Sequence, residues 1–106
     1  MDVKVKKVAN LLDDKMAKNI EIYELGSKHP LFDNVIIASV DVKRNLDAII
    51  SEIKKGEKDN EFEVKNYDTN NNEWVIIDFY DLIVHVFIND AREYYNLDEI
   101  LENYGK

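Results

Sequence analysis

The chain has 106 residues, a length that fits one domain spanning residues 1–106. Its 14 basic and 22 acidic side chains give a formal net charge of −8, which disfavours direct nucleic-acid binding. It has no cysteine, so disulfides and thiol catalysis are excluded, and the acidic balance favours a basic protein partner. No apolar run reaches the roughly 18 residues that span a bilayer and Met1–Lys7 lacks a signal-peptide core, so we expect a cytoplasmic protein that does not contact a membrane.

The first 40 residues contain one helical and two extended patterns. Helical spacing of apolar residues predicts an amphipathic helix over about 2–17. Its stripe is Val5, Val8, Ala9, Leu12 and Met16. Residues 20–25 alternate apolar and acidic side chains, as a half-buried strand does, and 34–39 form a continuous apolar run that predicts a central strand buried on both faces. The loop between them holds His29, which we interpret as a solvated side chain.

A second helix is predicted over about 42–55. Asp41 is the expected N-cap, and Gly56 is the expected left-handed residue after the last turn. Its buried stripe is expected to contain Val42, Leu46, Ile49, Ile50 and Ile53.

The second half of the chain is mostly extended. Residues 61–67 read as a strand with Phe62 and Val64 on one side, and 68–72 as a polar loop. After two further strands in 73–87, Asn89-Asp90 is expected to cap a helical turn at 91–95. A last helix over 97–104 is expected to begin with a variant capping box of Asn96 and Glu99. Its expected buried residues are Leu97, Ile100 and Leu101.

The order α-β-β-α-β-β-β-α predicts an α/β fold. Helices interleaved with strands and closed by a hairpin indicate a mixed β-sheet of about five strands, with helices mainly on one face.

The segment Glu73–Phe87 is the most apolar part of the chain and predicts a β-hairpin with a two-residue loop at 79–80 or 80–81. Either loop gives the same two faces, because successive strand side chains point to opposite sides. The apolar face, expected to pack on helices, contains Val75, Ile77, Leu82, Val84 and Val86, with Phe79 beside Leu82. What we call the mixed face contains Trp74, Ile76, Asp78, Ile83, His85 and Phe87.

The mixed face has two interpretations. Large apolar groups there indicate either that another element of the chain covers it or that it is kept for a partner. His85 is then either a hydrogen-bonded sheet histidine or a polar anchor in an apolar interface.

Catalytic motifs are sparse. Three separated glycines provide no phosphate-binding loop, and no serine–histidine motif is present. Asp78, Asp81 and His85 lie close enough in sequence to form a weak metal site, which leaves open a metal-dependent or nucleotidyltransferase-like enzyme. We expect no cofactor. Acidic pairs such as Asp13-Asp14 are more simply helix-surface charges.

The hairpin Trp74–Phe87, followed by Arg92-Glu93-Tyr94-Tyr95-Asn96-Leu97, resembles the signature of the ribosomal silencing factor (RsfS, or Iojap-like) family. Asn34–Ser39 and the first helix also fall where that family has its equivalents. The resemblance implies a nucleotidyltransferase-like fold without catalysis. It also implies binding to the large ribosomal subunit through its ribosomal protein number fourteen, which blocks joining of the small subunit and represses translation.

The resemblance and the hairpin pattern indicate the same contact surface. The expected contacts are Trp74, Ile76, Asp78, Tyr80, Asp81, His85 and Phe87. The chain departs from the family pattern at Tyr80, where the family usually has glycine, at Val40-Asp41-Val42 and at Asn72. A homodimer that buries the same face on itself is a further alternative.

Overall fold

A computed structural model describes residues 2–26 and 32–104, so the prediction for His29 lies outside the described residues. The strands are β1 (Lys18–Glu24), β2 (Asn34–Val40), β3 (Asn66–Asp68), β4 (Trp74–Asp78) and β5 (Leu82–Ile88). The helices are α1 (Val3–Asp14), α2 (Lys43–Lys58), α3 (Ala91–Tyr95) and α4 (Leu97–Tyr104). The predicted order is confirmed, with α3 as the expected short helical turn.

The strands form one mixed five-stranded sheet in the order β1-β2-β5-β4-β3. β2 and β5 run parallel, and the other three pairings are antiparallel. The predicted α/β class and mixed sheet are therefore confirmed. β2 is the expected central strand, because residues 35–40 are all buried.

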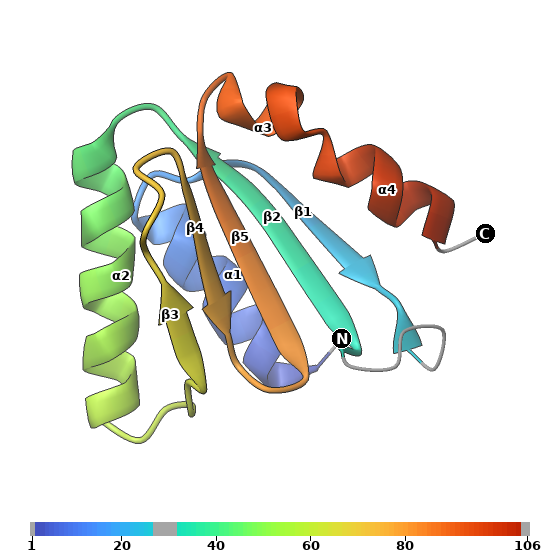
Figure 1. Cartoon of the computed structure of the whole chain (residues 1–106). Helices are drawn as coiled ribbons and strands as arrows, with labels where there is room; N and C mark the ends of the chain where they lie inside the picture. Colours follow the sequence, from blue (N-terminus) through green and yellow to red (C-terminus); the bar gives the residue numbers. More distant parts are fainter. Residues whose placement is uncertain (1, 27–31, 105–106) are drawn as a thin grey trace.

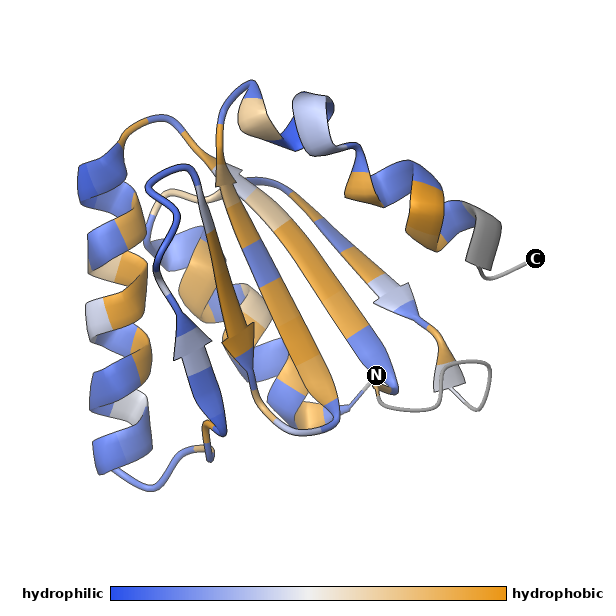
Figure 2. Cartoon of the chain, viewed as in Figure 1, coloured by the Kyte–Doolittle hydropathy of each residue, from blue (hydrophilic) through white to orange (hydrophobic). Residues whose placement is uncertain are grey.

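The two long helices, α1 and α2, cover one face of the sheet, while α3 and α4 lie against part of the opposite face (Figure 1). Apolar residues of α1 and α2 turn toward the strands, and polar residues turn outward (Figure 2). The larger core lies between these helices and the sheet, and a smaller cluster lies under α3 and α4.

α1 is shorter than predicted. The Asp2 carboxylate accepts the Lys4 amide N–H at 2.8 Å and caps the first turn. Val5, Val8 and Leu12 are buried as expected, but Met16 is not part of the stripe. Met16 follows the helix in a left-handed conformation (φ 72°), and that reversal points its side chain to solvent.

Two predictions about the ends of α2 are wrong. Val42 is the N-cap residue, and the Asp41 carboxylate instead pairs with Lys18 at 2.6 Å. The helix continues past Gly56 to Lys58, and the left-handed residue is Asn60 (φ 61°).

Gly56 is buried inside α2 because Phe62 packs on it. A Cβ atom at this glycine would lie 2.4 Å from Phe62 Cζ, closer than any real contact. The glycine therefore permits a close approach rather than a left-handed turn. In the rest of the predicted stripe Leu46, Ile49 and Ile53 are buried, whereas Val42 is exposed.

The predicted strand at 61–67 is mostly an unpaired segment. Of these residues only Asn66 and Tyr67, which begin β3, pair with β4, and Tyr67 lies opposite Ile77. Phe62 is nevertheless buried and meets Phe79 edge to face at 5.4 Å. The alternation thus predicted the burial of Phe62 correctly but not the strand.

α4 has the predicted bounds, with one error in its buried face. Leu101 is buried and Leu97 half-buried, but Ile100 is exposed because α4 covers the sheet with one narrow stripe. The Asn96 side-chain amide donates to the Glu99 carboxylate, but the Asn96 backbone N–H donates to the Arg92 carbonyl at 2.9 Å, so the expected capping box, in which Glu99 would accept that N–H, does not form. None of the helices in the described part of the chain is long and apolar enough to cross a membrane.

Candidate protein-binding site

The loop of the β4–β5 hairpin has an even number of residues, as the predicted apolar and mixed faces require. Asp78 pairs with Ile83, and the Phe79 amide donates to the Leu82 carbonyl at 2.8 Å, so Tyr80-Asp81 is the two-residue loop. The apolar face is buried under α1 and α2, as predicted. Every residue predicted for the mixed face therefore lies on the side of the sheet opposite α1 and α2.

Three aromatic rings of the mixed face form one cluster. Trp74 pairs directly with Phe87 across the strands, and their rings stack at 4.9 Å. The Trp74 indole N–H donates to His85 Nδ1 at 3.0 Å. Trp74 remains half-buried, and Ile76, Asp78 and Ile83 are also half-buried.

Phe87 corrects part of the prediction. Its side chain is fully buried beneath Trp74 and Tyr95, so it offers no area to a partner. Phe87 instead supports Trp74 from below. The alternation placed it on the correct face but did not show that α3 follows β5 closely enough to cover it.

Sequence reasoning missed two tyrosines of α3. Tyr95 lies 4.7 Å from the Trp74 ring, and Tyr94 meets Tyr95 edge to face at 5.2 Å. Tyr94 is 83% exposed and extends the aromatic surface beyond the sheet. Two consecutive tyrosines on a one-turn helix cannot both be buried, so the pair Tyr94-Tyr95 was a sequence signal for an exposed aromatic side chain on α3.

His85 is a neutral side chain held by its neighbours. Burial lowers the pKa of His85 to about 4, because a charged imidazole loses its hydration there. Since Nδ1 accepts the indole hydrogen bond, the ring proton lies on Nε2. His85 thus presents a hydrogen-bond donor on the mixed face.

Asp78 and Asp81 do not converge on His85. Asp78 accepts the Tyr80 amide N–H at 2.8 Å, whereas the Asp81 carboxylate pairs with Lys4 of α1. Among the described residues, no group of three His, Cys, Asp or Glu side chains is placed to hold a metal ion. The two acids therefore shape the turn and its charge.

Tyr80 occupies a strained position at the tip of this turn. Its φ of 79° lies in the left-handed region, and it is 53% exposed. The Asp81 amide donates to the Phe79 carbonyl at 3.2 Å, which closes a γ-turn around Tyr80. Lys4 also donates to the Phe79 carbonyl at 3.1 Å, so α1 holds the turn in place.

A polar network fastens α3 and α4 to the sheet. Arg92 donates to both oxygens of Asp98 at 3.0 Å, and the Tyr23 hydroxyl donates to Asp98 at 2.7 Å. The hydrogen bond from Arg92 lowers the pKa of Asp98, while burial and Asp98 raise the pKa of Tyr23. Arg92 further donates to Ser39 Oγ at 3.1 Å. The network keeps Tyr95 against Trp74.

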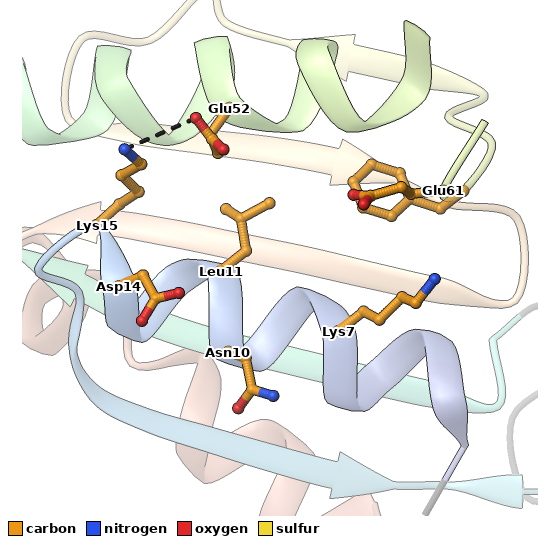
Figure 3. A pocket seen from close by; sticks show the side chains of 8 residues that line it. Lys7, Asn10, Leu11, Asp14, Lys15, Glu52 and Glu61 are labelled. Atoms are coloured by element: carbon orange, nitrogen blue, oxygen red, sulfur yellow. Dashed lines mark ion pairs between the residues drawn. The ribbon is translucent and has the colours of Figure 1, made fainter. Parts of the chain in front are cut away.

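Two of the hollows in the described part of the chain differ in their relation to the mixed face. The first, of about 380 Å³, lies between α1 and α2 and contains both lysines and acids, including a Lys15–Glu52 pair at 3.7 Å (Figure 3). Its mixed charges select neither cations nor anions. The second, of about 680 Å³, lies beside β4 and shares Trp74 and Ile76 with the mixed face. The second hollow is therefore continuous with the candidate site.

Comparison with known proteins gives a consistent result. Residues 1–104 match the family model described as "Ribosomal silencing factor during starvation". A ribosomal silencing factor of Bacillus subtilis is 32% identical over 97 residues, covering 91% of this chain and 82% of the relative. The chloroplastic Iojap protein of Zea mays is 38% identical over 69 residues, covering 64% of this chain and 30% of that protein.

Solved structures agree with the fold. A crystal structure from Bacillus halodurans aligns with a TM-score of 0.78 and 30% identity, covering 92% of this chain and 91% of that one. A crystal structure from Chromobacterium violaceum aligns with a TM-score of 0.85 and 24% identity, covering 96% and 88%.

Proposed function

The chain belongs to the ribosomal silencing factor family, and from this premise we propose that it binds the large ribosomal subunit at the face that meets the small subunit. Its bulk there blocks subunit joining and represses translation. The contact is made with ribosomal protein number fourteen. A basic partner of this kind suits the net charge of −8.

The mixed face is the proposed contact surface. Trp74 and Ile76 supply apolar area, and both remain half-buried in the free protein. His85 donates one hydrogen bond through Nε2, and Asp78 at the turn attracts basic side chains, whereas Asp81 is already paired with Lys4 and adds less. Tyr80 at the turn and Tyr94 on α3 extend the surface at either end.

One observation carries this proposal. The aromatic cluster Trp74–Tyr95–Tyr94 stays partly exposed although the polar network of Arg92 and Asp98 holds α3 in a fixed position beside it. An exposed aromatic surface on a rigid sheet is typical of a protein interface.

The proposed mechanism is occupancy without catalysis. Asp78, Asp81 and His85 have separate structural partners or orientations, which supports a binding role. A nucleotidyltransferase-like or metal-dependent enzyme predicts saturable binding of magnesium, zinc or ATP in calorimetry. Such binding, lost on Asp78→Asn or His85→Gln, would replace the silencing proposal.

Sedimentation with purified large ribosomal subunits tests the proposal. We expect the protein to co-sediment with large subunits and to reduce the joined ribosomes that form when small subunits are added. No co-sedimentation at low salt would overturn it. A homodimer formed through the mixed face would appear in sedimentation equilibrium and would compete with subunit binding.

A further inference from the structure

The hollow beside β4 is walled by the candidate site on one side and by acids on the other. Trp74 and Ile76 form its apolar wall, and the carboxylates of Asp68 and Glu73 and the amides of residues 70–72 form the rest. β3 ends at Asp68, opposite Ile76, so β4 extends beyond its edge partner where the hollow opens. The mixed face therefore continues to the edge of the sheet.

Charge distinguishes this hollow from its neighbours. Within the described part of the chain no lysine or arginine lines it, whereas the hollow between α1 and α2 includes Lys7 and Lys15. None of the ion pairs among the described residues uses Asp68 or Glu73. The hollow thus combines two uncompensated carboxylates with an indole.

The loop that carries these acids is ordered by its own hydrogen bonds. The Asn70 backbone N–H donates to Asp68 Oδ1 at 3.3 Å, and the Glu73 backbone N–H donates to Asn71 Oδ1 at 2.8 Å. Because the loop is already shaped, a ligand does not bear the full entropic cost of ordering it.

We infer that this hollow receives an arginine side chain of the protein partner. The inference rests on the proposed function and refines it by naming the partner group. A guanidinium is planar and stacks on an indole, and its donors match carboxylate and amide oxygens at the same time. The uncompensated acids repel phosphate, which excludes a nucleic-acid backbone as the occupant.

A small peptide tests the inference without the ribosome. Trp74 is the only tryptophan, so its fluorescence and indole N–H resonance report on the hollow and the adjoining mixed face, and the variants below separate the two. We expect acetyl-Gly-Arg-Gly-amide to shift both signals saturably, and the neutral citrulline peptide of the same shape to bind at least about fivefold more weakly. Equal responses to the two peptides, or none, would overturn the inference.

Matched variants locate the effect. Glu73→Gln and Asp68→Asn should each lower the affinity for the arginine peptide by about threefold. Asp59→Asn and Glu63→Gln remove the same charges from exposed positions outside the hollow and should change nothing. If all four variants lose affinity equally, net charge rather than the hollow attracts the peptide, and the inference fails.

A second arm separates the two proposals. Large-subunit binding should weaken in Glu73→Gln and Asp68→Asn and should also become less sensitive to salt. Normal binding by both variants overturns the inference but leaves the proposed function intact. If the wild-type protein does not bind subunits at all, the proposed function fails, and the peptide comparison alone decides whether the hollow accepts arginine.

Discussion

The Trp74 indole donates its only hydrogen bond to His85 Nδ1, at 3.0 Å, across adjacent strands of the sheet. This contact joins the one tryptophan of the chain to its buried histidine and orients both rings on the mixed face. The proposed apolar anchor and the proposed polar anchor of the interface therefore depend on each other.

The pH dependence of stability should report on His85. Its folded pKa of about 4 lies below the roughly 6.5 of an unfolded histidine, so the unfolded state binds more protons between these values. The free energy of unfolding should be highest above about pH 6.5 and fall by up to about 3 kcal/mol as the pH drops toward 4. Chemical denaturation at several pH values measures this. His85→Gln should remove most of the slope.

Trp74→Ala should weaken binding while leaving the protein folded. Truncation removes the stacking on Phe87 and the bond to His85, which should cost about 2 kcal/mol of unfolding free energy. Large-subunit affinity should fall about 30-fold or more. Co-sedimentation of the variant, shown to be folded by circular dichroism, measures this. Met16→Ala removes an exposed apolar residue next to α1 and should leave binding unchanged.

Ile76→Arg should abolish subunit binding without unfolding the chain. Ile76 is half-buried on the mixed face, and a guanidinium there repels a basic partner. Ile50→Arg places the same group at a half-buried position of α2, over the opposite face of the sheet. Melting curves should show similar destabilisation of both variants. Equal subunit binding by Ile76→Arg and Ile50→Arg would show that the mixed face is not the interface.

Tyr80→Gly should stabilise the protein by about 1 kcal/mol, because glycine adopts the φ of 79° without strain. The same variant should bind subunits less tightly if Tyr80 is a contact. Thermal melting and co-sedimentation give the two readouts. Asn60→Gly, at φ 61°, should raise the free energy of unfolding by less, since asparagine tolerates this conformation. A loss of stability in Tyr80→Gly would mean that the tyrosine side chain supports the turn.

Gly56→Ala should destabilise the protein by about 1–3 kcal/mol. The new methyl group would meet Phe62 Cζ at 2.4 Å, and α2 and the segment after it would have to separate. Adding Phe62→Leu should recover part of the loss, because the smaller side chain leaves room. Denaturant titration of the single and double variants measures this coupling. Additive effects would show that the close approach does not cause the loss.

The hairpin and its faces could be predicted because strand side chains alternate strictly and the loop has an even number of residues. Burial of Phe87 could not be predicted, since it depends on α3 folding back beside Trp74, which no local pattern specifies. The parallel pairing of β2 with β5 joins segments more than 40 residues apart and leaves no turn signal. Gly56 followed two lysines, as a C-cap often does, but tertiary packing with Phe62 determined its role.

The candidate site was predicted in part for the same reason. Alternation and the resemblance identified Trp74, Ile76 and His85 on one face, where the structure has them. Tyr94 and Tyr95 lay outside the strand pattern, and the hollow beside β4 arises from a loop whose shape depends on hydrogen bonds to Asp68 and Asn71.

The position of β5 in the sheet has a consequence for folding during synthesis. β5 lies between β2 and β4, yet it comes late in the chain, at Leu82–Ile88. Until β5 emerges, β2 has β1 on one side and an open edge, with unpaired backbone N–H and C=O groups and mostly apolar side chains, on the other. Docking of β5 must close a loop of more than 40 residues, which makes this step slow compared with formation of the β1–β2 pair. The nascent chain therefore carries an aggregation-prone strand until β5 has been made.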